Sequence, residues 1–107
     1  MRGEMLQPVI AHQINRLRSF CSEQHITDCV IFGSATRDDF SATSDVDVVV
    51  AFDKDQQVTF FRLNRLAEQM AQILGRPVDL HTWAEIHPKL QPKIQQEGVS
   101  VLERPAG

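Results

Sequence analysis

Two apolar segments separated by a polar loop are the feature that most constrains the fold of this chain. Residues 30–32 are apolar and end at Gly33, and residues 45–52 begin with two aspartates in alternation with valines and then become wholly apolar. Valine-rich runs bounded by polar residues are typical of β-strands. We therefore expect one strand that ends at Gly33 and a second strand over residues 45–52.

The second strand would carry two carboxylates on one face. Alternate side chains of a strand share a face, so Asp45 and Asp47 would lie side by side, about 6.5–7 Å apart at their Cα atoms. Like charges this close disfavour joint ionisation, and a hard divalent cation that accepts oxygens from both is the natural neutraliser. Taken alone, such a pair is more often two solvated residues at the start of a strand.

A third carboxylate follows in another short segment that is typical of a strand, residues 77–82. Val78, Leu80 and Thr82 would form one face of this strand, while Asp79 and His81 would point to the other. If the two aspartate-bearing strands are neighbours in one sheet, Asp79 joins the first two carboxylates. A cluster of three would favour a cation site over solvated surface residues.

The turn after the first strand has features of an anion site. Gly33 permits backbone geometries closed to other residues and lets a ligand approach closely. Ser34 can cap a short helix, whose free N–H groups attract phosphate, and Arg37 could fold over the same anion. An isolated Gly-Ser turn, however, is common in α/β proteins.

The rest of the chain alternates helical and strand patterns. Apolar residues at helical spacing predict helices over residues 8–24 and 57–74, with a shorter helix broken by prolines within residues 83–97. A final strand is expected over residues 99–103. The order predicts an α/β or α+β fold, with a small mixed β-sheet, helices packed on one face and the aspartates on the other.

Composition limits the function classes. The 107 residues fit a single domain over residues 1–107, and the formal net charge of −3 disfavours nucleic acid as a partner. The N-terminus lacks a signal peptide core, and apolar runs are too short to span a membrane. Cys21 and Cys29 have no metal-type spacing, so both are expected to be reduced packing residues of a cytoplasmic protein.

The combination of the two motifs resembles a known superfamily. Gly33-Ser34, ten further residues and then Asp45-x-Asp47 match the G-S-x10-D-x-D pattern of the DNA polymerase β-like nucleotidyltransferases. The later V-D-L at residues 78–80 and the chain length resemble its minimal nucleotidyltransferase (MNT) branch, and the resemblance spans nearly the whole chain. One departure is Asp38, where the branch often has glycine.

The resemblance implies a mechanism and a partner. Two Mg2+ ions would be bridged by Asp45 and Asp47, while Asp79 would complete the ion beside the acceptor and help to take its proton. Gly33 and Ser34 would hold the β and γ phosphates of ATP, with Arg37 as a charge clamp. The acceptor would be a tyrosine of a helical HEPN toxin, and AMP transfer would make this chain a type VII-like antitoxin.

Two other functions stay open. Asp38 and Asp39 place negative charge near the proposed triphosphate site, which favours a non-catalytic antitoxin that neutralises its partner by stoichiometric contact. Small-molecule nucleotidylation of the aminoglycoside type is the third hypothesis, although those enzymes usually resemble longer chains with an added helical domain. The acceptor, the base preference and self-association into a homo-oligomer are not determined by the sequence.

Overall fold

A computed structural model of the chain describes residues 8–33 and 45–102, which contain both helices and strands. In chain order they are α1 (Pro8–Ala11), α2 (Ile14–Glu23), β1 (Ile26–Phe32), β2 (Val46–Phe52), α3 (Phe60–Leu74), β3 (Val78–Thr82), the 3-10 helix η3 (Trp83–Glu85), α4 (Gln91–Glu97) and β4 (Val99–Ser100). None of these helices is long and apolar enough to cross a membrane.

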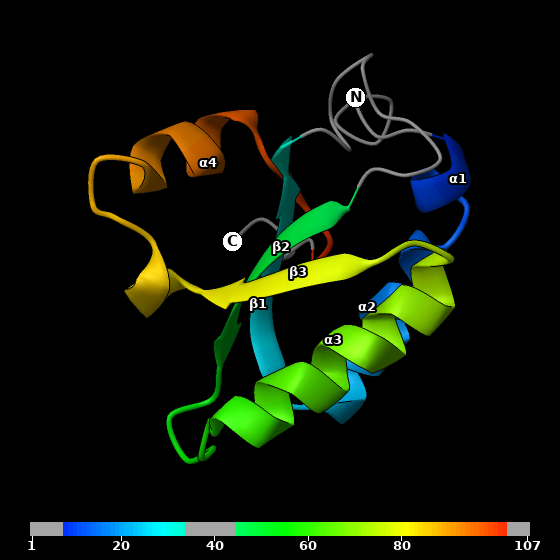
Figure 1. Cartoon of the computed structure of the whole chain (residues 1–107), viewed down its shortest axis with the longest axis horizontal. Coiled ribbons are helices and arrows are strands. Elements are labelled where there is room, and N and C mark those ends of the chain that lie inside the picture. Colours follow the sequence, from blue (N-terminus) through cyan, green and yellow to red (C-terminus); the bar gives the residue numbers. More distant parts are fainter. Residues whose placement is uncertain (1–7, 34–44, 103–107) are drawn as a thin grey trace, which may run out of the picture.

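The strands form one four-stranded mixed sheet in the order β3-β2-β1-β4 (Figure 1). β1 pairs antiparallel with both β2 and β4, whereas β2 and β3 are parallel. A parallel pair needs a crossover connection, and α3 supplies it between β2 and β3. The predicted α/β class with a small mixed sheet is therefore confirmed.

α2 and α3 lie together on one face of the sheet, as Figure 1 shows. Each helix has an apolar stripe at helical spacing, and the sheet offers the apolar face of β2, so the three surfaces bury one another. This main core includes Leu17, Cys21, Val46, Val48, Val50, Leu66, Met70 and Leu74. Burial of this surface is the principal stabilising contribution to the fold.

The two cysteines belong to this core. Cys21 and Cys29 are free and buried, in agreement with the expectation that they are packing residues. A hydrogen bond with Cys21, reinforced by burial, raises the pKa of the Cys29 thiol well above its usual range. Cys29 is therefore an uncharged component of the core.

The ends of α3 set the start of β3. The side chain of Thr59 accepts a hydrogen bond from the backbone N–H of Arg62 at 3.1 Å, which caps the helix. Gly75 ends the helix in the left-handed region at φ 70°, a conformation that glycine adopts without cost. The backbone N–H of Val46 then donates to the carbonyl of Pro77 at 2.8 Å and aligns β3 with the beginning of β2.

The opposite face of the sheet is partly covered as well. Ile94 of α4 packs against Val30 and Val49, and Trp83 and Phe32 border this second, smaller cluster. The principal helices thus share one face as expected, while the short α4 covers part of the other. Val30 and Val49 point to the same side as the aspartates and need this cover because they are apolar.

Three elements differ most from those expected. The helix predicted over residues 8–24 is interrupted, because the N–H of Gln13 bonds to the carbonyl of Ile10 in a turn tighter than an α-helix. The helix predicted from residue 57 begins at Phe60, after its Thr59 cap. The last strand has two residues, Val99–Ser100, and pairs with β1 at the edge of the sheet.

The core assignment predicts unequal costs for two leucine substitutions. Leu66→Ala should lower the free energy of unfolding by about 2–5 kcal/mol, because Leu66 is 1% exposed and its removal leaves a cavity. Leu90→Ala should change it by less than about 0.5 kcal/mol, because Leu90 is 52% exposed. Urea denaturation of both variants checks this, and equal losses would contradict the assignment.

Candidate active site

Two carboxylates from neighbouring strands form the centre of the candidate site. Asp47 of β2 is paired directly with Asp79 of β3 in the parallel ladder, so both side chains lie on the same face. Asp47 is half-buried and Asp79 is exposed. The structure thus confirms that the strands are neighbours and that Asp79 faces the same side as Asp47.

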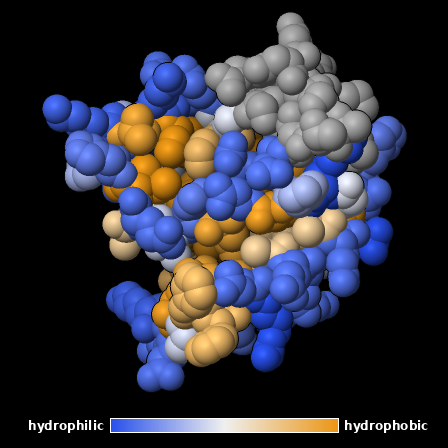
Figure 2. Space-filling view, in the orientation of Figure 1, coloured by the Kyte–Doolittle hydropathy of each residue, from blue (hydrophilic) through white to orange (hydrophobic). Residues whose placement is uncertain are grey.

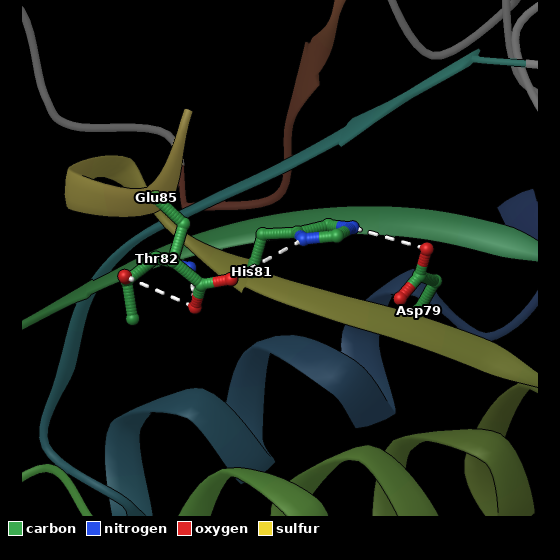
Figure 3. A network of polar contacts seen from close by, with 4 residues as sticks. All are labelled: Asp79, His81, Thr82 and Glu85. Atoms are coloured by element: carbon green, nitrogen blue, oxygen red, sulfur yellow. Dashed lines mark hydrogen bonds and ion pairs between the residues drawn. The ribbon is translucent and has the colours of Figure 1, made fainter. Parts of the chain in front are cut away.

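His81 extends this pair along β3 (Figure 3). Its Nε2 atom lies 3.1 Å from Oδ2 of Asp79, and its Nδ1 atom lies 3.6 Å from Oε2 of Glu85. The imidazole therefore lies between two carboxylates, one on each side of the ring. It also lies against Phe32, with ring centroids 6.3 Å apart.

Glu85 is held in turn by the start of the 3-10 helix. Its Oε1 atom accepts hydrogen bonds from the backbone N–H and the hydroxyl of Thr82, both at 3.3 Å. Thr82 is the cap of η3, and Glu85 is the third residue of that helix, so the two form a capping box. Figure 3 shows the resulting row of polar contacts from Thr82 through Glu85 and His81 to Asp79.

The donor atoms at this face suit a divalent cation. Within the described ranges, Asp47, Asp79 and His81 each offer one ligand atom, and the three atoms lie within 4.8 Å of one another. Carboxylate oxygens are the ligands that Mg2+ prefers, while imidazole also suits Mn2+ and later transition metals. The residues present therefore fit a magnesium-type ion.

Gly33 brings the end of β1 against Asp47. It has φ 75°, and a Cβ atom added there would lie 2.3 Å from Oδ2 of Asp47. Glycine is thus required both for the backbone conformation and for the space that the carboxylate occupies. The glycine of the Gly-Ser motif and the second aspartate of the D-x-D motif are neighbours in space.

The remaining predicted site residues have different outcomes. Asp45 precedes β2 directly and is exposed; it does not belong to the three-residue group that the described part of the chain contains. Ser34, Arg37 and Asp38 lie outside the described residues. The roles proposed for Asp45, Ser34 and Arg37 therefore stay predictions.

Two residues of the network had no role assigned from sequence. Strand alternation predicts that His81 shares a face with Asp79, because the two residues are two positions apart in the same strand. Glu85 follows His81 by four residues across a strand-to-helix junction, where no regular periodicity applies. Only the turn at Thr82 brings its carboxylate back to the imidazole.

A small cavity adjoins the glycine turn. It has a volume of about 220 Å³ and is lined by Phe32, Gly33, Leu90, Lys93, Ile94 and Glu97. Lys93 and Glu97 belong to α4, which thereby forms one wall beside the end of β1. The site thus combines an acidic face on β2 and β3 with a partly apolar hollow under α4.

Comparison with known proteins identifies the family. Residues 14–101 match the nucleotidyltransferase domain family. A relative from Methanocaldococcus jannaschii, named "Putative protein adenylyltransferase MJ0435", is 39% identical over 67% of this chain and 75% of its own. This match covers most of both chains.

Solved structures share the fold. One described as a "putative minimal nucleotidyltransferase" has a TM-score of 0.70 and 25% identity, and the match covers 82% of this chain and 88% of that one. Another, a tri-AMPylated HEPN toxin in complex with an MNT antitoxin from Shewanella oneidensis, has a TM-score of 0.61 and 16% identity over 87% and 71% of the chains. The chain therefore belongs to the nucleotidyltransferase domain family.

Proposed function

We propose that this chain transfers AMP from ATP to a tyrosine hydroxyl of a HEPN-type toxin and acts as its antitoxin. The acceptor oxygen attacks the α-phosphorus, the bond to the β-phosphate oxygen breaks, and pyrophosphate and a proton are released. The observation that carries the proposal is the Asp47–Asp79 pairing beside Gly33. The adenylyltransferase name of the M. jannaschii relative and the AMPylated toxin of the S. oneidensis complex support it.

The acidic residues would hold two Mg2+ ions. These ions, when bound, would neutralise the phosphates and the attacking and leaving oxygens. Asp47 is placed for this task because it is half-buried between β1 and β3, so its position is restrained. Asp79 is exposed on the edge strand, where an acceptor can reach it. Asp45, one residue before β2, would contribute the other bridging carboxylate.

The glycine turn would receive the triphosphate. Gly33 has no side chain, so phosphate oxygens can approach the backbone closely at this position next to Asp47. Ser34 follows directly in sequence and would add a hydroxyl and a backbone N–H, and Arg37, three residues later, would add a permanent positive charge. Such an arrangement would bring the phosphates and the carboxylate-bound cations to one place.

Neutralisation by contact alone is the second candidate. Val58, Phe60 and Phe61 expose 40%, 74% and 82% of their surface around the start of α3. Figure 2 shows this hydrophobic surface together with a second area beside α4. Exposed apolar side chains that cluster in this way are typical of protein contact surfaces. A contact antitoxin would need neither nucleotide nor the aspartates.

The first test compares three aspartate variants in adenylyl transfer. The chain is incubated with labelled ATP, Mg2+ and a HEPN-type toxin, and the toxin is analysed by mass spectrometry. Asp47→Asn and Asp79→Asn should each lower the rate by about a hundredfold or more, because preorganised charge stabilisation at the reacting phosphate is lost. Asp55→Asn, in the exposed turn after β2, is the matched control and should retain the wild-type rate.

Two results would contradict the proposal. The first is a near-wild-type rate in Asp47→Asn. The second is equal protection from the toxin with and without ATP, which would favour neutralisation by contact alone.

A pair of glycine variants tests the contact between the turn and the acidic face. Gly33→Ala and Gly75→Ala should each destabilise the fold by about 1–2 kcal/mol, because both glycines have left-handed backbones. Only the alanine at position 33 meets Asp47, whereas nothing lies within 4 Å of a Cβ at position 75. Gly33→Ala should therefore weaken Mn2+ binding, measured by EPR, while Gly75→Ala should leave it unchanged.

Equal Mn2+ affinity in the two glycine variants would show that Gly33 does not border the cation site. Thermal melts of both variants establish that they are folded at the temperature of the binding measurement.

A further inference from the structure

We propose that His81 is a positioning residue: its Nε2–H holds the Asp79 carboxylate beside Asp47, while Phe32 and Glu85 border the imidazole ring. The inference rests on the proposed function, in which Asp79 binds the cation next to the acceptor. It adds a residue that neither the D-x-D motif nor the Gly-Ser motif contains. It also accounts for the contacts that continue from Asp79 through His81 to Glu85 at the end of β3.

Asp79 needs such a restraint because of its place in the sheet. β3 is an edge strand with β2 as its neighbour, and the Asp79 side chain is 56% exposed. An exposed side chain on an edge strand samples several rotamers and loses their entropy on fixation. The 3.1 Å contact with Nε2 of His81 occupies one oxygen of the carboxylate and selects one orientation.

His81 can provide this restraint because its ring is bordered on two sides. The Nδ1 side faces Glu85 at 3.6 Å, and the ring lies against Phe32, which directly precedes Gly33. The side chain of His81 is 27% exposed, less than those of Asp79 and Glu85. Glu85 is anchored to Thr82 by two hydrogen bonds. The positioning chain therefore ends in the backbone of β3.

The charges are consistent with this role. Asp47 and Asp79 are direct neighbours across the ladder, so their carboxylates repel each other when no cation is present. A donor that points at Asp79 offsets part of this repulsion and keeps the carboxylate near Asp47. Residues that orient metal-binding carboxylates in this way typically change metal affinity or activity by about 10- to 100-fold when they are replaced.

The experiment uses two substitutions of His81 with opposite expectations. His81→Ala removes the donor, whereas His81→Gln keeps an amide N–H at a similar reach. His87→Ala is the matched control, because His87 is an exposed histidine that accepts a hydrogen bond from the backbone N–H of Lys89. Each variant is measured in steady-state adenylyl transfer with Mg2+, and in Mn2+ binding by EPR without nucleotide.

His81→Ala should lower kcat and the affinity for Mn2+ by about tenfold, while KM for ATP stays within about twofold of the wild type. His81→Gln should restore most of both quantities. Glu85→Ala, which removes the carboxylate beside Nδ1 of His81, should lower kcat and Mn2+ affinity by less than His81→Ala does. Melting temperatures establish that each variant is folded.

Four results would overturn the inference. The first is wild-type kcat and Mn2+ affinity in His81→Ala, and the second is a loss of either quantity that His81→Gln does not restore. The third is a wild-type chain that does not bind Mn2+. The fourth is nitrogen hyperfine coupling to Mn2+ in the wild type that disappears in His81→Gln. Such coupling would mean that His81 is a direct ligand rather than a positioning residue.

The proposed function can fail separately. A wild-type chain that binds Mn2+ in a His81-dependent manner but transfers no AMP would refute AMP transfer and support the role of His81.

Discussion

The parallel pairing of β2 with β3 is the constraint on which the site depends. It places Asp47 opposite Asp79, and the bond from the Val46 N–H to the Pro77 carbonyl fixes the register at the first residue of β2. Because side chains alternate along a strand, a shift of one residue would turn Asp79 to the helix-covered face. The acidic centre is therefore a consequence of register.

That register is in turn set by α3 and its two ends. The helix is 15 residues long, begins after the Thr59 cap and ends at Gly75 in the left-handed conformation. Its buried residues Leu66, Met70 and Leu74 lie on one stripe and fix its rotation against the sheet. The crossover therefore delivers β3 to the edge of β2, with its apolar side chains toward the helices.

Much of this arrangement could be predicted from the sequence. Valine-rich strands, the α3 stripe and the alternation around Asp79 are local patterns, and each was confirmed. Three features were less accessible. The break between α1 and α2 has no proline or glycine to mark it, the short helix expected within residues 83–97 is divided into η3 and α4, and β4 has only two residues.

The sequence alone determined which side chains share a face of each strand and where glycine had to lie, because strand periodicity and left-handed backbone geometry are local properties. Only the tertiary structure decided that Gly33 lies against Asp47, that Asp79 faces Asp47, and that Glu85 reaches His81. These contacts join separate strands or cross the turn at Thr82. They depend on strand order, register and turn geometry, which long-range packing selects.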